Sequence, residues 1–219
     1  MTGDRPAPPP RSSKRLPWSR VEFAALDFEA TGLDFERDRI ISFGVVPIRE
    51  GRVEVGESVY QLVDPGEVTS SPEAVTVHGL RTIDLVGAPS VETAKLALGA
   101  AISRRFLVTW WAGVEAAFLD KLFGGGVRWW NKRAVDVRQL LLALEGDAAA
   151  QLTLTQAAEL FGVPVASPHH ALDDALVTAQ LFLVTASKLA GRNRGSVKDL
   201  LRPPVPQPPP VLTRPRAPM

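Results

Sequence analysis

Two acidic residues, Asp27 and Glu29, stand two positions apart after an apolar run that begins at Ala24, and the turn-forming pair Thr31-Gly32 follows them. Residues i and i+2 of a β-strand share one face. Two carboxylates on one face repel each other, and burying them is costly unless a cation lies between them. Divalent cations such as Mg²⁺ and Mn²⁺ prefer oxygen ligands of this kind. The pair therefore indicates a metal site at a strand end; the alternative is a solvated strand end with two unrelated acids.

A second group of chemically active residues lies far along the chain, in the sequence His169-His170-Ala171-Leu172-Asp173-Asp174. A carboxylate in the first turn of a helix is stabilised by about 0.3–1 kcal/mol, so helix capping alone explains Asp173. Successive residues of a helix point about 100° apart, so only one of the two aspartates can share a face with Ala171 and the core. Asp174 is the better candidate for the inward position.

Together the two groups could hydrolyse a phosphodiester. Two metal ions held by carboxylates about 3.5–4 Å apart can stabilise both the attacking and the leaving oxygen of such a displacement. Histidine, whose ordinary pKa is about 6.5, can accept a proton from water near neutral pH. The combination of Asp27, Glu29, Asp174 and a loop histidine is more specific than either group alone.

A sheet and a set of helices must bring these groups together. Three successive apolar stretches with short links, 21–28, 38–48 and 53–63, predict an antiparallel meander. The chain then alternates helical and strand patterns, and the interval 66–89 reads as irregular. We expect short strands at 105–110 and 133–137 and helices at 91–102, 113–123, 137–144, 154–161 and 171–189. This order predicts an α/β fold with a sheet of mixed direction and helices packed on it.

Composition excludes several other classes of protein. The chain of 219 residues has no cysteine, which excludes disulfides, thiolate metal sites and a cysteine nucleophile. No apolar run approaches the roughly 20 residues needed to span a bilayer, and the basic N-terminus has no apolar segment behind it as a signal peptide would. We therefore expect a cytoplasmic protein.

Charge and proline are distributed unevenly. Residues 1–20 carry five basic residues and one acidic residue, and residues 191–219 carry six and one, so residues 21–190 have a net charge of −8 in a chain whose total is +1. Thirteen of the nineteen prolines lie in 1–17 and 203–218. These patterns predict one folded domain at 21–190 between disordered, basic, proline-rich arms at 1–20 and 191–219. The arms could attract a polyanion or serve only as solubilising tails.

The two groups of residues resemble the motifs of the DEDD superfamily of 3′→5′ exonucleases. Asp27-Phe28-Glu29 with Thr31-Gly32-Leu33, and His169 five positions before Asp174, are similar to its histidine-bearing branch. That branch includes the proofreading epsilon subunit of bacterial replicative polymerase and ribonuclease T. The resemblance covers roughly residues 21–190 and implies a ribonuclease H-like fold, a mixed five-stranded sheet with flanking helices.

The resemblance also implies an activity. It is the metal-dependent removal of nucleoside 5′-monophosphates from the 3′ ends of single-stranded nucleic acid, with DNA favoured over RNA and RNA left open, and with two Mg²⁺ or Mn²⁺ ions. A DNA polymerase or a second copy of the chain would be a partner. By the same resemblance Asp27, Glu29 and Asp174 would be metal ligands, and His169 would be the general base. Thr31, Gly32 and Leu33 would meet the terminal nucleotide, and Gly32 would let the backbone approach closely.

The middle motif of the family departs from its usual form. Glu115 stands where an aspartate is expected, and it would complete the metal ligands with a side chain one methylene longer; Asp120 fits the spacing less well. Trp110-Trp111 replaces a polar pair, and these indoles could stack on bases or pack in the core.

Two rival interpretations remain. The departure in the middle motif motivates the first, a nucleic-acid-binding module that has lost catalysis; the second is a polymerase-bound proofreading subunit with little activity alone. A phosphotransferase is disfavoured, because the glycine run at 124–126 lacks the following lysine and serine or threonine of a phosphate-binding loop.

Overall fold

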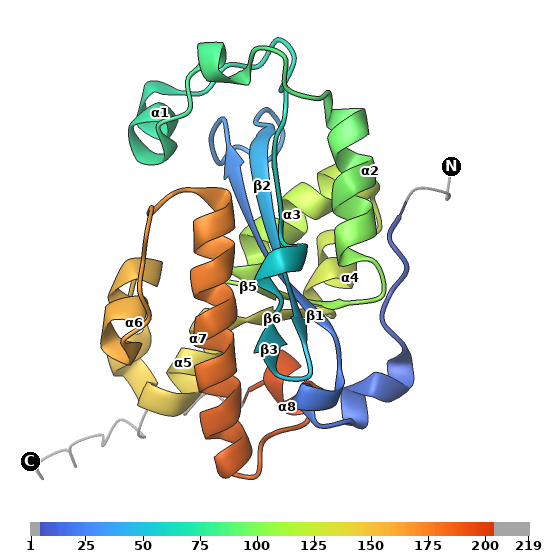
Figure 1. The fold of residues 1–219 in the computed structure, drawn as a ribbon, viewed down its shortest axis with the longest axis vertical. Coiled ribbons are helices and arrows are strands. Elements are labelled where there is room, and N and C mark those ends of the chain that lie inside the picture. Colours follow the sequence, from blue (N-terminus) through green and yellow to red (C-terminus); the bar gives the residue numbers. More distant parts are fainter. Residues whose placement is uncertain (1–4, 204–219) are drawn as a thin grey trace, which may run out of the picture.

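The computed structural model describes residues 5–203, and within them six strands form one mixed sheet (Figure 1). The order across the sheet is β3-β2-β1-β5-β6, and β4 pairs with another part of β2. β1 runs antiparallel to β2, which pairs antiparallel with β3 and β4, whereas β1, β5 and β6 are parallel. The strands are β1 (Phe23–Ala30), β2 (Ile40–Arg49), β3 (Arg52–Val53), β4 (Val59–Leu62), β5 (Phe106–Thr109) and β6 (Ala134–Asp136).

The mixed sheet confirms the fold class expected from the sequence, with one change in the strand count. The third predicted strand, 53–63, is divided into β3 and β4 by the short 3₁₀ turn Val55–Glu57. Both pieces pair with β2, so the predicted five strands become six.

The helices agree closely with the predicted intervals. They are α1 (Pro72–His78), α2 (Val91–Ile102), α3 (Ala112–Phe123), α4 (Val127–Asn131), α5 (Val137–Glu145), α6 (Leu154–Phe161), α7 (Ala171–Gly191) and α8 (Val197–Leu201). The short helices α1, α4 and α8 were not predicted. The signals for α1 were nevertheless present, because Ser71 caps it by accepting a hydrogen bond from the backbone N–H of Ala74, and Gly79 ends it in the left-handed conformation.

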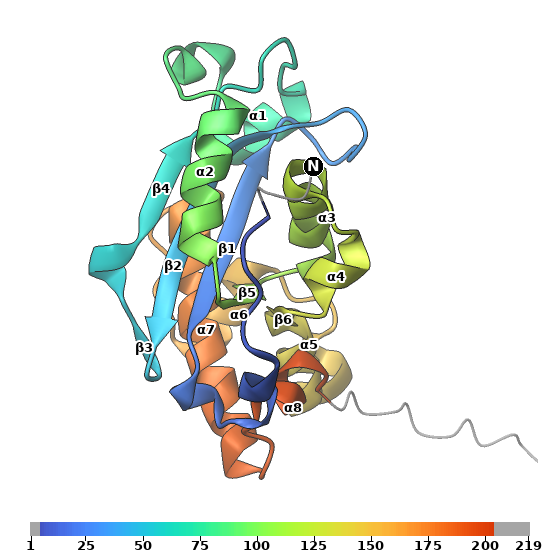
Figure 2. The same ribbon diagram turned by 90° about the vertical axis from the view of Figure 1, so that its right-hand side faces the viewer.

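Helices cover both faces of the sheet (Figure 2). α5, α6 and α7 pack on one face, and α2, α3 and α4 pack on the other. Along β1, Phe23 and Ala25 enter the first core, whereas Ala24 and Leu26 enter the second. This alternation follows from the two-residue period of a strand and shows that β1 is buried on both sides. Among residues 5–203, no helix has the length and apolar character needed to cross a membrane.

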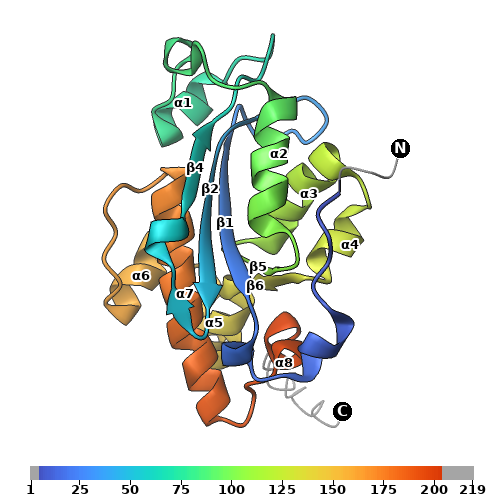
Figure 3. The ribbon, with the colours of Figure 1, turned by 45° about the vertical axis from the view of Figure 1, so that its right-hand side comes forward.

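The segments before β1 and after α7 are packed against the domain, so the prediction of disordered arms does not hold for residues 5–20 and 191–203 (Figure 3). Trp18 is only 9% exposed and lies edge-on to Phe182 of α7, with ring centroids 5.6 Å apart. The backbone N–H of Trp18 donates to the carbonyl of Gly195 (2.9 Å), and that of Val197 donates to Leu16 (3.1 Å). These segments differ from the prediction because apolar side chains among their basic residues, such as Trp18, Val197 and Leu200, are buried in the domain. Residues 1–4 and 204–219 lie outside the described part of the chain.

Candidate active site

Three carboxylates meet at the carboxyl end of β1. Asp27 and Glu29 project from the same face of this strand, and Asp174 lies in the first turn of α7. One carboxylate oxygen from each lies within 4.8 Å of the other two, a spacing that would allow all three to bind one metal ion. The fold therefore brings Asp174 close to Asp27 and Glu29, although Asp27 and Asp174 are 147 positions apart in the sequence.

A glycine opposite Asp27 lets α7 approach the sheet. Gly44 of β2 pairs with Asp27 across the antiparallel ladder. A Cβ atom at Gly44 would overlap the backbone of Ala171 and Leu172, so the first turn of α7 rests directly on the main chain of β2. The absence of a side chain at this position is what allows Asp174 to reach the two acids of β1.

Glu115 supplies a fourth carboxylate from α3. Its side chain is 5% exposed, and among the described residues its Oε2 atom has no hydrogen-bond partner. Burial, together with a smaller contribution from the charge of Asp136, raises the pKa of Glu115 to about 8. Glu115 is also the largest charged contributor to the raised pKa of Asp27. It lies outside the group of three but faces it, and its unpartnered buried oxygen is what a cation would satisfy.

The other acids also raise one another's affinity for protons. Burial, then the charges of Glu115, Glu29 and Asp174, raise the pKa of Asp27 well above its usual range. Burial and the charge of Asp174 raise the pKa of Glu29 to about 8. Burial likewise raises the pKa of Asp174, although the backbone N–H of His169 partly offsets this by donating to its Oδ2 atom at 3.1 Å. Such mutual repulsion is relieved by a divalent cation, so this donor set fits one.

The two histidines before α7 have different surroundings. His169 is exposed beside the acids, and its backbone has a φ of 61°, the left-handed region that is uncommon for residues other than glycine. The ring of His170 lies against Tyr60, with centroids 4.4 Å apart, and its Nδ1 atom is 3.5 Å from Asp173 Oδ2. His170 and Asp173 therefore hold the loop against β4, which leaves His169 exposed next to Asp174.

Asp38, which no sequence motif singled out, holds the loop after β1. Thr31 is buried; its hydroxyl donates to Asp38 Oδ1 at 2.7 Å and accepts from the backbone N–H of Arg39 at 3.1 Å. Gly32 lies against the same Asp38 carboxylate, which a Cβ would overlap. Of the three residues expected to meet a substrate, only Leu33 presents a largely exposed side chain (68%). Asp38 just before a strand gave no local signal, because its partners lie across the loop.

The remaining residues of the middle motif divide by role. Trp110 packs partly buried against the core, whereas Trp111 is 53% exposed with the guanidinium of Arg138 4.9 Å from its ring centroid. The alternative ligand Asp120, in the last turn of α3, instead accepts a hydrogen bond from the backbone N–H of Gly126 at 2.7 Å and so stabilises the turn after the helix.

Asp136 joins the two helices beside the site. Its carboxylate accepts from the backbone N–H groups of Ala112 and Gln139, both at 3.1 Å, and so fixes the first turns of α3 and α5. His78 is the last residue of α1. Burial is the main reason that its pKa is lowered, and the charge of nearby His169 adds to this.

A mixed sheet of this topology, with buried acids at the carboxyl end of its central strand, defines a ribonuclease H-like nuclease domain. The nuclease domain of 3′hExo, described as a DEDDh family member bound to rAMP, has the same fold. It superposes with a TM-score of 0.63 at 19% sequence identity, over 79% of this chain and 95% of that one.

The chain belongs to the exonuclease family RNase_T, whose model matches residues 24–182. Two curated relatives are DNA polymerase III proteins. One is the PolC-type polymerase of Thermotoga petrophila, 30% identical over 171 residues, and the other is the epsilon subunit of Aquifex aeolicus, 26% identical over 170 residues. Each match covers 76% of this chain; it covers 12% of the PolC-type protein and 81% of the epsilon subunit. These findings confirm the resemblance to histidine-bearing DEDD exonucleases.

Proposed function

We propose that this nuclease is a metal-dependent 3′→5′ exonuclease that removes nucleoside 5′-monophosphates from single-stranded DNA. The observation that carries the proposal is the meeting of half-buried Asp27 with buried Glu29 and Asp174, near a fourth, buried carboxylate at Glu115 and an exposed histidine. Such a concentration of carboxylates destabilises the folded protein unless bound cations neutralise their charge. DNA is favoured over RNA because the curated relatives are DNA polymerase proteins.

Each residue has a role in the proposed reaction. Asp27, Glu29, Glu115 and Asp174 would hold two Mg²⁺ or Mn²⁺ ions, which when bound would supply positive charge to the phosphate oxygens. The imidazole of His169 would accept the proton of the attacking water, and its exposed position leaves room for the water and the scissile phosphate.

The loop after β1 would position the substrate. Leu33, largely exposed on the loop that follows β1, would pack on the terminal nucleoside, while Thr31 and Gly32 shape that loop.

The test uses a single-stranded DNA oligonucleotide and an RNA of the same sequence, each labelled at its 5′ end, with Mn²⁺ and with or without chelator. We expect a ladder that shortens from the 3′ end, faster for DNA, absent in chelator and absent in Asp174→Asn. Asp147→Asn is the matched control, because it makes the same chemical change at an exposed position in the short turn after α5; it should retain a ladder. Chromatography of the released nucleotides should identify 5′-monophosphates.

The alternative is a catalytically weak subunit that assists a polymerase, as the names of the curated relatives suggest. The replacement of the family's polar pair by Trp110-Trp111 motivates it. If no ladder forms on either substrate while Mn²⁺ still raises the melting temperature, the exonuclease proposal fails and this alternative stands.

A further inference from the structure

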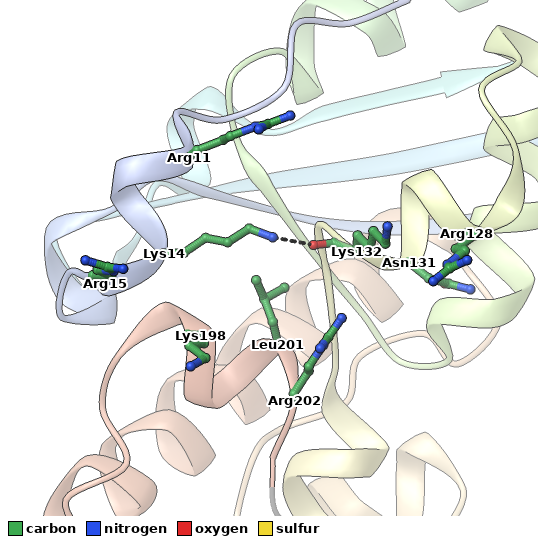
Figure 4. A pocket seen from close by; sticks show the side chains of 9 residues that line it. All are labelled: Arg11, Lys14, Arg15, Arg128, Asn131, Lys132, Lys198, Leu201 and Arg202. Carbon is green, nitrogen blue, oxygen red and sulfur yellow. Dashed lines mark hydrogen bonds between the residues drawn. The ribbon is translucent and has the colours of Figure 1, made fainter.

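A strongly basic pocket lies where the N-terminal segment, α4 and α8 meet (Figure 4). It has a volume of about 570 Å³, and seven of its nine lining residues are lysine or arginine; the other two are Asn131 and Leu201. The 3₁₀ helix Arg11–Arg15, which precedes β1, provides one wall. Arg128 and Lys132 provide a second wall, and Lys198 and Arg202 provide the third.

The positive charges of this pocket are not neutralised by neighbouring acids. Within residues 5–203, none of the seven basic side chains forms an ion pair with a carboxylate. The Nζ atom of Lys14 reaches across the pocket to the carbonyl of Lys132 at 3.1 Å. Burial, and then the charges of Arg202, Lys132 and Arg11, lower the pKa of Lys14, so these charges converge on one space. This concentration of positive charge contrasts with residues 21–190 as a whole, which carry a net charge of −8.

A second hollow connects this pocket with the helix that carries Glu115. It has a volume of about 200 Å³, shares Asn131 and Leu201 with the basic pocket, and extends to Ala112 and Gly113 at the start of α3. The exposed indole of Trp111, with Arg138 over its ring, stands immediately before that helix. An exposed aromatic ring beside a guanidinium is a surface on which bases can stack.

We propose that the basic pocket binds backbone phosphates of the same nucleic-acid strand whose 3′ end lies at the acid group; this inference rests on the proposed function. Each guanidinium group can donate two parallel hydrogen bonds to the oxygens of one phosphate, and a base can stack on the adjoining indole of Trp111. An acidic peptide is disfavoured, because Leu201 is the single apolar residue that lines the pocket and could anchor such a peptide.

The separation of the two sites sets the expected dependence on strand length. The N-terminal segment and α8, which line the pocket, lie near the amino end of β1 (Figure 3), and the acids lie at its carboxyl end; Phe23 to Glu29 alone spans roughly 20 Å of extended strand. A short oligonucleotide at the acid group therefore cannot reach the pocket, whereas a strand of about 20 nucleotides can. Contacts of this kind raise affinity without taking part in the cleavage step.

The experiment compares wild type with the double variant Arg128→Glu/Lys198→Glu, whose two side chains are exposed. Binding of a fluorescent 20-nucleotide DNA is measured in chelator by anisotropy at several salt concentrations. The matched control, Arg52→Glu/Lys188→Glu, makes the same change in net charge at exposed positions outside the pocket. In parallel, all three proteins are assayed with Mn²⁺ on a p-nitrophenyl ester of thymidine 5′-monophosphate, which can occupy only the acid group.

We expect the pocket variant to bind the 20-mer at least about tenfold more weakly at low salt, with a shallower salt dependence, because each lost phosphate contact reduces the slope by about 0.7. Its hydrolysis of the small ester should equal that of wild type, and the control should bind within about twofold of wild type. Equal weakening in both variants, or in neither, would overturn the inference.

Polyglutamate of similar length provides a further test. If it displaces the DNA from wild type at lower concentration than unlabelled DNA does, the pocket is a peptide site and the inference is wrong. Because binding is measured without metal, a protein that fails to hydrolyse the ester contradicts the proposed function, whereas a 20-mer that binds independently of the pocket contradicts this inference.

Discussion

Glu115 illustrates how a buried acid can be unfavourable for folding and yet be retained. It is almost completely buried, its Oε2 atom has no partner among the described residues, and its pKa is raised to about 8. Because an acid with a raised pKa in the folded state is protonated more readily there than in the unfolded chain, its ionised form lowers the free energy of unfolding. That penalty is absent below the ordinary pKa of 4.5, grows between 4.5 and about 8, and is complete above about 8.

The first prediction concerns Glu115→Gln. In chelator at pH 8 this variant should be more stable than wild type by at least about 1 kcal/mol, since one pKa unit corresponds to about 1.4 kcal/mol. As the pH falls from 8 toward 5, the free energy of unfolding of wild type should rise. The rise should be smaller in Glu115→Gln. Urea denaturation at several pH values measures both.

The same variant should lose the stabilisation that Mg²⁺ or Mn²⁺ gives to wild type, and most of its nuclease activity. Glu67→Gln, at an exposed position, is the control and should change neither quantity. A Glu115→Gln protein that is less stable in chelator yet fully active would show that Glu115 is a structural residue.

At the residue scale, the sequence predicted those contacts that depend on local periodicity. The i, i+2 spacing predicted that Asp27 and Glu29 share one face, and helical periodicity predicted that Asp174 points inward; their meeting, which the structure shows, was expected from the combination of motifs and the family resemblance. Glu115 could be assigned only through the family resemblance, because nothing local distinguishes it from a solvated helix acid. The role of Asp38 in holding Thr31 was missed, since that hydrogen bond depends on a loop conformation.

At the scale of elements, the approach of α7 to the sheet determines whether the acid group forms at all. Gly44 allows this approach because its position opposite Asp27 has no side chain to separate the helix from β2. Nothing in the sequence around Gly44 indicated this contact, since its partner helix begins more than 100 residues later.

The second prediction is therefore that Gly44→Ala impairs activity more than stability. The added methyl group must displace the first turn of α7, at a cost of about 1–3 kcal/mol, and carry Asp174 away from Asp27. We expect nuclease activity to fall at least about tenfold in a protein that still unfolds cooperatively. Thermal unfolding and the oligonucleotide assay measure the two effects.

Gly56→Ala is the control for this prediction, because a Cβ at Gly56 meets no atom within 4 Å. It should leave both stability and activity close to those of wild type. Equal activity in the two alanine variants would mean that α7 tolerates a shift without loss of the site.

The long, strongly periodic elements were those the sequence predicted well. α2 and α6 have the predicted bounds, and α7 begins at the predicted residue. The short helices α1, α4 and α8 were missed because five to seven residues carry too little periodicity to be distinguished from a turn. The division of the third strand was missed for a similar reason, since a three-residue turn interrupts an otherwise alternating pattern.

At the scale of the whole molecule, the segments at the two ends of the described chain complete the domain. The N-terminal segment and α8 lie together at the end of the structure opposite the carboxyl end of β1 (Figure 3), and their basic residues line the pocket described above. Composition alone could not predict this arrangement, because the few buried apolar residues are outnumbered by basic residues and prolines.

The third prediction is that Trp18→Ala lowers the free energy of unfolding by about 3–5 kcal/mol, because it removes a buried aromatic side chain that packs on Phe182. Chemical denaturation measures the loss. Trp111→Ala removes the same side chain at an exposed position and should cost far less. If both variants lose the same small amount, the N-terminal segment does not contribute to the stability of the domain.

The hydrogen bonds between Leu16 and Val197 and between Trp18 and Gly195 join residues almost as far apart along the chain as the described part allows. These contacts can form only once the intervening domain has brought the two ends together, so they are expected to form after the transition state for folding. Contacts that form so late influence the rate at which the native protein opens much more than the rate at which it folds. The contacts that Trp18 and α8 form would thus act chiefly by slowing unfolding, which lengthens the lifetime of the folded protein.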